Sequence, residues 1–252
     1  MKIFVTGYKG FIGRNLTPKL KDWVGYSGDI LDKNKLAKEM KGCHMVIHLA
    51  GMFNGPDSNL IYTTNLVGTA NVIQAMHLNN ISKIIFTSSV GAEGRFYNAY
   101  DDSKFIAEKI VRDKSINTTI LRLSNLYGRD QKDKLITFLL NGFKKGQVEV
   151  TGDGLQTRDL VYIDDVVSAI LKATRVSGCD KPIDIGCGKS YSILEVIDII
   201  SQILNKKVKI KFIEFPPHIK DMRVSKVNLG LAKKMLGYSP RYSLVQGLKK
   251  MI

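Results

Sequence analysis

The sequence predicts an α/β fold built on a parallel β-sheet, and three observations support this. Short apolar runs alternate with helical patterns through the first half of the 252 residues, and the first run ends in a glycine-rich turn that opens a helix. After about residue 125 the pattern changes to mixed short strands and helices. Strands that alternate with helices are typical of βαβ units, whose crossover helices cover both faces of a parallel sheet.

Five strands are expected in the first half, because short apolar and β-branched runs fit buried parallel strands. They lie at residues 3–6, 23–27, 45–49, 84–87 and 119–123. Helices are expected where apolar residues recur with helical spacing, opening near Phe11 and spanning 35–40, 60–77 and 100–113. Little sequence separates the second strand from Asp29, so we expect a trimmed crossover and a sheet smaller than usual.

The second half predicts a smaller α+β lobe. Helical patterns cover 136–145, 164–173, 231–236 and 244–251, and short strands are expected at 148–150 and 183–185. Ser192 followed by Glu195 predicts a capping box at the start of another helix, because each side chain can bond the other's backbone N–H. Asp164 and Asp165 are expected to cap the helix that they begin.

The composition is that of an ordinary globular protein. Hydrophobic residues make up 44% and charged residues 24%, near the average for soluble domains. No apolar stretch reaches the ~18 residues of a membrane helix, and no signal peptide is visible. The three cysteines and four histidines lack metal-ligand spacing, and His48 is expected to be a satisfied core residue. We therefore expect no metal site, no membrane contact and a cytoplasmic chain with reduced thiols.

The net charge of +15 favours an anionic partner such as a phosphorylated substrate. The lysines are spread along the chain, and no basic block is interleaved with the aromatic residues that a stacking platform for single strands would need. We therefore expect a solvated lysine-rich surface and no nucleic-acid partner.

The turn after the first strand has the properties of a phosphate-binding loop. Gly7 permits a tight turn, Gly10 lets the backbone approach a pyrophosphate, and Gly13 lets helix and strand pack closely. The helix N-terminus then offers unpaired N–H groups and partial positive charge to the phosphates. The whole pattern predicts a Rossmann-like doubly wound parallel sheet with a smaller C-terminal α+β substrate lobe. We place the dinucleotide-binding domain at 1–125, with parts of 155–190 returning to it, and the mainly substrate-binding lobe at 126–252.

The residues after the second strand leave the choice between NAD and NADP open. An acid that would hold a ribose 2′-hydroxyl about 20 residues after the glycine turn is not obvious. Asp29 comes slightly later and is better placed to accept a hydrogen bond from the adenine amino group. Lys9 and Arg14 could attract a 2′-phosphate.

Tyr100 and Lys104 form a candidate catalytic pair, because residues four apart share a helix face. Tyrosine has a pKa of about 10 in model peptides, so it is a poor base at neutral pH. A cationic lysine and a positive nicotinamide ring are expected to lower that pKa by stabilising the phenolate. Ser89, at the end of the preceding strand, can hydrogen-bond the same substrate oxygen. These roles define a proton-transfer site next to the cofactor loop.

On these motifs the sequence resembles the extended short-chain dehydrogenase/reductase family, and specifically its NAD-dependent nucleotide-sugar epimerases, dehydratases and ketoreductases. The resemblance covers nearly the whole chain. The matching segments are 5–13, 28–30, 46–51, 65–69, 87–89, 100–104, 121–128, 152–159, 162–165 and 236–240.

The resemblance implies the roles of individual residues. The catalytic residues would be Ser89, Tyr100 and Lys104. The cofactor, NAD or NADP, would lie on Gly7, Gly10, Phe11, Ile12, Gly13, Asp29, Ile30, Leu49, Ala50, Gly51, Asn65, Tyr100 and Lys104. A nucleotide-diphosphate sugar would be held by Ser89, Asn125, Arg158 and Arg223. The resemblance also implies a homodimer formed through the helices at 60–77 and 100–113.

The leading functional hypothesis is a nucleotide-sugar 4-epimerase of the UDP- or dTDP-sugar type that acts through a 4-keto intermediate. One alternative is a 4-ketoreductase that uses NAD(P)H, and another is a catalytically silent cofactor-binding regulator. Val90 and Gly91 follow Ser89 where the family's dehydratases usually carry an Asp-Glu pair. We therefore expect no acid at this point, which disfavours 4,6-dehydration.

Overall fold

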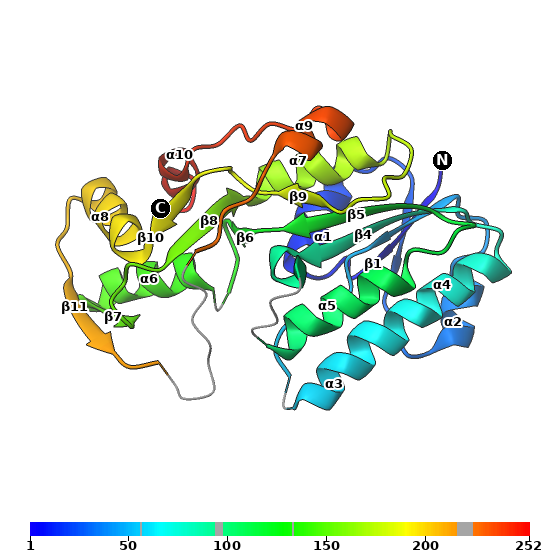
Figure 1. The fold of residues 1–252 in the computed structure, drawn as a ribbon, viewed down its shortest axis with the longest axis horizontal. Helices are drawn as coiled ribbons and strands as arrows, with labels where there is room; N and C mark the ends of the chain where they lie inside the picture. The colour runs from blue at the N-terminus through cyan, green and yellow to red at the C-terminus, as the bar shows by residue number, and fades with distance from the viewer. Residues whose placement is uncertain (56, 94–97, 133, 216–223) are drawn as a thin grey trace.

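The computed structural model describes residues 1–55, 57–93, 98–132, 134–215 and 224–252 and confirms the predicted fold class (Figure 1). Its centre is a six-stranded sheet with the order β2-β1-β3-β4-β5-β9, paired in parallel throughout. The strands are β1 (Ile3–Thr6), β2 (Trp23–Tyr26), β3 (Met45–His48), β4 (Lys83–Ser89), β5 (Asn117–Leu123) and β9 (Ile183–Ile185). Among the described strands, β2 alone lies outside β1, where the doubly wound fold usually has two strands, so the expected trimming is confirmed.

Helices cover both faces of this sheet (Figure 1). One face carries α2 (Lys33–Glu39), α4 (Gly68–Leu78) and α5 (Ala99–Ile110), and the other carries α1 (Phe11–Leu16), α7 (Ile163–Ala173) and α9 (Gly230–Leu236). The helix expected at 60–77 consists of α3 (Ser58–Tyr62), a π-helical turn at Thr63–Val67 and α4. No described helix is long and apolar enough to span a lipid bilayer.

The buried side chains alternate along the strands, as a sheet covered on both faces requires. Ile3 and Val5 of β1 belong to a cluster that includes α7, whereas Phe4 belongs to a second cluster with α2 and α4. This alternation explains why the short apolar runs could be recognised as strands, since both neighbours of each residue are also buried.

In its described residues, the smaller lobe contains two short sheets and three helices. Their bounds are β6 (Asn125–Tyr127), α6 (Leu135–Lys145), β7 (Gln147–Thr151), β8 (Thr157–Tyr162), β10 (Ser190–Ser192), α8 (Ile193–Leu204), β11 (Lys209–Ile213) and α10 (Leu244–Lys249). The predicted capping box at Ser192 and Glu195 is confirmed. Asp164 and Asp165 lie in the first turn of α7 as expected, but the capping expected of them is wrong, because Tyr162 holds the N-cap position without a side-chain cap. The Asp165 carboxylate instead accepts hydrogen bonds from the backbone N–H groups of Arg241 and Tyr242.

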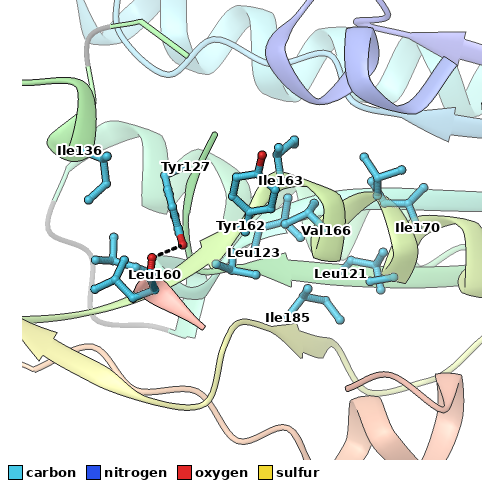
Figure 2. Close-up of a cluster of buried hydrophobic side chains, with 14 of the residues drawn as sticks. Leu121, Leu123, Tyr127, Ile136, Leu160, Tyr162, Ile163, Val166, Ile170 and Ile185 are labelled. Atoms are coloured by element: carbon cyan, nitrogen blue, oxygen red, sulfur yellow. Dashed lines mark hydrogen bonds between the residues drawn. The ribbon is translucent and has the colours of Figure 1, made fainter. Parts of the chain in front are cut away.

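One apolar cluster joins the lobe to the sheet (Figure 2). Its members come from β5, β9 and α7 as well as from the lobe, and they include Leu121, Leu123, Tyr127, Ile136, Leu160, Tyr162, Ile163, Val166, Ile170 and Ile185. The chain enters the lobe after β5 and returns to the sheet through α7 and β9. This shared core fixes the lobe over the carboxyl ends of the strands, where doubly wound folds bind ligands.

Candidate active site

A cavity of about 440 Å³ lies where the central sheet meets the lobe. Residues at or just after the carboxyl ends of three neighbouring strands line it: Leu49 follows β3, Ser89 ends β4 and Ser124 follows β5. Tyr100 and Lys104 enter from α5. The fold therefore gathers side chains distant in sequence at the edge where parallel sheets place their functional groups.

Lys104 is a buried cation at the floor of this cavity. Its side chain is 4% exposed, and Nζ donates a hydrogen bond to the Thr87 carbonyl at 2.9 Å. Nζ also lies 4.7 Å from the centre of the Phe86 ring. Burial lowers the pKa of Lys104 to about 8, with Glu108 opposing that shift. The lysine is thus held in place by β4 and faces the space beside Gly51.

Tyr100 lies one helical turn before Lys104, as expected, but its ionisation differs from the expectation. The Lys104 ammonium is 5.9 Å from the centre of the Tyr100 ring. Burial, and then the neighbouring Asp101 carboxylate, raise the pKa of Tyr100 above its ordinary value. The predicted lowering is therefore wrong for the protein alone, because at this distance the lysine does not offset the desolvation of the phenolate.

Ser89 and Ser88 end β4 but have different partners. The Ser89 hydroxyl donates to Asp101 Oδ1 at 3.3 Å and accepts from the Gly91 N–H at 3.1 Å. Ser88 donates to Glu108 at 2.7 Å, and Glu108 also forms an ion pair with Arg122. Ser88 is thus committed to a buried ion pair, which leaves Ser89 as the serine beside Asp101 and Tyr100.

His48 anchors the segment that follows β3. It is 1% exposed, and its two ring nitrogens contact the hydroxyls of Thr6 at 2.6 Å and Thr69 at 3.0 Å. Burial lowers its pKa to about 3, so the ring is neutral, and the expected satisfied core histidine is confirmed. The Thr6 hydroxyl in turn accepts from the Ala50 N–H, which fixes this segment next to the glycine turn.

The glycine turn approaches this segment closely. Gly7 has φ +70°, and a Cβ there would lie 2.6 Å from the Ala50 nitrogen. A Cβ at Gly13 would collide with the backbone of Tyr8. Gly10 precedes α1 without a side-chain cap, so the first N–H groups of this helix, which have no intrahelical acceptor, face outward. The loop fits a dinucleotide pyrophosphate, which needs a backbone free of side chains and several N–H donors.

A second hollow continues from the glycine turn along the end of β2. Its lining consists of Gly7, Tyr8, Lys9, Tyr26, Ser27, Gly28, Asp29, Ile30 and Ala50. Tyr26 points into the core and donates a hydrogen bond to the Asp29 carbonyl, while the Asp29 carboxylate accepts from the Leu31 N–H. Together with Ile12, Leu49 and Gly51 in the central cavity, these residues offer room for both halves of a dinucleotide.

Two residues expected at the cofactor are engaged mainly with protein. Asn65 bonds both backbone groups of Met52 and the Ser103 hydroxyl, so it ties the loop after β3 to α5. The Phe11 side chain packs near Gly128, which leaves its backbone N–H as the group that can face the phosphates.

On the lobe side, the cavity is lined by Asn125 and Arg158. Arg158 lies on β8, and its guanidinium donates to the Thr157 carbonyl. Asn125 lies on β6, which pairs with β8. The pairing of these strands brings the two expected substrate ligands to the same wall. Arg223, the other expected ligand, lies outside the described residues.

The cavity also contains side chains that were not predicted. Phe53 lies with its ring 4.8 Å from that of Tyr100, and Lys134 Nζ is 3.0 Å from the centre of the Phe53 ring. Phe215 comes from the end of the segment after β11. No acid follows Ser89 directly, as expected, since Val90 and Gly91 stand there, but the Asp101 carboxylate reaches the Ser89 hydroxyl from α5. No local motif marks Phe53, Lys134 or Phe215, since only tertiary packing brings them together.

The fold and the glycine turn are those of a nicotinamide-dinucleotide enzyme, and Ser89, Tyr100 and Lys104 line one cavity. The chain belongs to the NAD dependent epimerase/dehydratase family, which it matches over residues 3–186, and its cofactor is NAD.

Three comparisons place the chain within that family. A Methanocaldococcus jannaschii protein provisionally named UDP-glucose 4-epimerase is 30% identical over 99% of this chain and 97% of its own length. UDP-glucuronic acid decarboxylase 3 of Arabidopsis thaliana is 25% identical over 100% of this chain and 88% of its own length. The structure of UDP-glucose 4-epimerase from Thermotoga maritima, solved with UDP-glucose, has a TM-score of 0.87 at 25% identity and covers 100% of this chain and 97% of that one.

Proposed function

We propose that the protein is a nucleotide-sugar 4-epimerase that acts on a UDP-sugar through tightly bound NAD and a 4-keto sugar intermediate. The observation that carries this proposal is the meeting of Ser89, Tyr100 and Lys104 in one cavity whose opposite wall carries Asn125 and Arg158. Such a cavity can hold a sugar against a cofactor while the lobe holds its diphosphate. The similarity to UDP-glucose 4-epimerases supports the choice of substrate class.

Tyr100 is the proposed proton carrier. Its phenolic oxygen takes the proton of the sugar 4-hydroxyl and returns it when the alcohol re-forms, which is general acid–base catalysis. When bound, NAD supplies the acceptor and donor of the C4 hydride and a positively charged ring in its oxidised form. Tyr100 depends on that positive charge, because burial keeps its pKa high in the protein alone.

Lys104 and Ser89 orient the reacting groups. The buried Lys104 ammonium faces the space next to Gly51, where we place the nicotinamide ribose, and it adds positive charge near Tyr100. Ser89 holds the sugar oxygen. Return of the hydride to the other face of C4 requires the keto sugar to turn, so the lobe must hold the diphosphate while the sugar moves.

Arg158 and Asn125 are the proposed diphosphate ligands. An arginine fork matches the geometry of phosphate oxygens better than a lysine does. Arg223 is proposed for the same role from its place in the sequence. Gly7, Gly10, Gly13 and the hollow at residues 26–30 are proposed to hold the cofactor's pyrophosphate and adenosine.

A 4-ketoreductase that consumes NADPH is the second candidate, and the end of β2 favours it. Ser27 and Gly28 follow this strand where an acid would select against a 2′-phosphate, and Lys9 lines the same hollow. The two candidates differ in redox balance, because the epimerase returns its hydride to the same sugar and the reductase does not.

Turnover without added cofactor tests the proposal. Purified protein is denatured to identify any nucleotide that it retains, and native protein is incubated with UDP-glucose, UDP-galactose and UDP-glucuronate while products are followed by NMR. Interconversion of the C4 epimers without added NAD supports the epimerase. Release of CO₂ from UDP-glucuronate indicates a decarboxylase, and net NADPH consumption with a 4-keto sugar indicates the reductase; either result without epimer interconversion rejects the proposal.

We further propose a cytoplasmic homodimer. The three cysteines are free thiols, which suits a reducing compartment. Leu60 and Val67 are 37% and 49% exposed on the long helix formed by α3, the π turn and α4, and exposed apolar side chains of this kind can pack against a second copy. Analytical ultracentrifugation tests the dimer, and Val67→Asp is expected to shift the protein to monomer.

A further inference from the structure

The Asp101 carboxylate occupies the active-site cavity although the mechanism above gives it no role. Asp101 is 6% exposed, and it is the only carboxylate among the described residues that line this cavity. The other charged groups on the lining are Lys104 on α5 and Lys134 and Arg158 on the lobe. A buried carboxylate disfavours the ionisation of a neighbouring residue that must become an anion, because like charges repel.

Three groups fix the position of this carboxylate. Asn98, which caps α5, donates its side-chain amide to Asp101 Oδ2 at 3.0 Å. The Ser89 hydroxyl donates to Oδ1 at 3.3 Å. Gly91 provides the space, because a Cβ there would collide with the Asp101 carboxylate. The side chain is therefore built into the end of β4 and not free to turn toward solvent.

These contacts determine which hydrogen bonds Ser89 has left for a substrate. A serine hydroxyl has one hydrogen to donate and two lone pairs that accept. The Gly91 N–H uses one lone pair, and ionised Asp101 takes the hydrogen. Ser89 can then only accept, so it competes with Tyr100 for the single hydrogen of the sugar hydroxyl and cannot donate to a keto oxygen.

The same negative charge acts on Tyr100, the preceding residue. An anion close to a phenol disfavours the phenolate, and after burial Asp101 is the second cause of the raised pKa of Tyr100. Burial also raises the pKa of Asp101, with Ser89 and Asn98 opposing that shift. The two side chains that hydrogen-bond the Asp101 carboxylate, the Ser89 hydroxyl and the Asn98 amide, do not titrate, and the other described ionisable side chains that line the same cavity are Tyr100, Lys104, Lys134 and Arg158.

We propose that Asp101 is a positioning residue that acts on both Ser89 and Tyr100: its ionised carboxylate holds the Ser89 hydrogen and opposes the Tyr100 phenolate, and loss of its charge weakens both effects. The inference rests on the proposed function for its catalytic meaning. Its electrostatic part concerns the protein itself and can be measured without turnover.

Asp101→Asn tests the inference, with Asp102→Asn as its matched control. Asparagine keeps the shape and removes the charge. Asp102 is the adjacent carboxylate on the same helix, but it accepts from the Tyr62 hydroxyl instead. Tyrosinate absorbance is followed by ultraviolet titration in each NAD-loaded protein. The same titration is run on each protein with Tyr100→Phe added, and the difference between the two curves gives the pKa of Tyr100.

We expect Asp101→Asn to lower the pKa of Tyr100 by about one unit or more, the usual effect of removing a like charge at short range, and Asp102→Asn to leave it unchanged. Equal pKa values in all three proteins, or equal shifts in both variants, overturn the inference even if the protein is an epimerase. Absence of epimerase activity overturns the proposed function but leaves this titration intact.

The pH profile of kcat then tests the catalytic meaning. The acid limb, which reports formation of the Tyr100 phenolate, is expected to move to lower pH in Asp101→Asn and to stay in place in Asp102→Asn. A uniform loss of kcat at every pH, with both limbs unmoved, indicates a merely structural role and contradicts the inference.

Discussion

The two ends of the proposed cofactor cleft are built differently. At the reacting end, Lys104 is buried and Ser89 and Asn65 have several protein partners each. At the adenosine end, Ser27 and Asp29 are exposed and β2 is an edge strand. Proton and hydride transfer need groups held to a fraction of an ångström, whereas adenosine binding relies mainly on shape and backbone. The sheet is short at this edge, next to β2, and not at β3, β4 and β5, whose ends line the central cavity.

The largest effect is expected from Tyr100→Phe at the reacting end. Removal of the proton carrier should lower kcat by roughly 10²- to 10⁴-fold, while the retained NAD is unchanged because the ring still fills its place. Tyr62→Phe, which removes a hydroxyl bonded to Asp102, is the control and should be nearly neutral. Full activity of Tyr100→Phe would remove the basis for the proposed mechanism and favour a binding-only protein.

Lys104 should make stability depend on alkaline pH. Its pKa in the folded chain is about 8 against 10.5 ordinarily, so between these values the unfolded chain binds a proton that the folded chain does not. Stability of the cofactor-free protein should therefore rise with pH across this window, by roughly 3 kcal/mol at most. Lys104→Met should abolish this rise, as measured by urea unfolding at several pH values. Parallel pH curves for the two proteins would contradict this account of the buried ammonium.

Gly7 lies between the two ends of the cleft. Comparison of Gly7→Ala with Gly42→Ala distinguishes the cost of a positive φ from the cost of a steric collision. Gly7 and Gly42 both have positive φ, but a Cβ at Gly42 meets nothing within 4 Å. Gly7→Ala should cost about 2 kcal/mol more than Gly42→Ala in unfolding free energy, because of the contact with Ala50. It should also release NAD. Equal costs in the two variants would show that the approach to Ala50 imposes no constraint.

The smallest effect is expected at the adenosine end, from Ser27→Asp. A carboxylate there should weaken NADP binding by about tenfold, roughly 1.4 kcal/mol, and leave NAD binding equal or tighter. Isothermal titration with both cofactors measures this, and Ser27→Asn controls for size. An unchanged preference would mean that the 2′-position lies elsewhere.

The sequence predicts the fold well because its strands are short apolar runs and its glycine turn has a fixed place between β1 and α1. The predicted capping by Asp164 and Asp165 is wrong, since the backbone N–H groups of Arg241 and Tyr242 bind the Asp165 carboxylate. Local preference for a helix start cannot reveal such a distant partner.

The candidate site could likewise be predicted from the sequence only where local spacing determines it. Spacing of four residues suffices to put Tyr100 and Lys104 together, and the end of β4 predicts Ser89. Asp101 was missed because helical spacing alone turns it away from Tyr100, whereas the first turn of α5 lies against the end of β4 and meets the cavity with more than one face. Phe53 and Lys134 come from separate loops, so no sequence pattern joins them.

Tracing the hydrogen at C4 tests the central claim most directly. A UDP-sugar carrying deuterium at C4 is incubated with the purified protein in ordinary water, without added cofactor, and the product is analysed by NMR. The account predicts the C4 epimer with its deuterium still on C4, since one bound NAD accepts and returns the same hydride. An epimer that has lost its label to water, or no epimer at all, would contradict it.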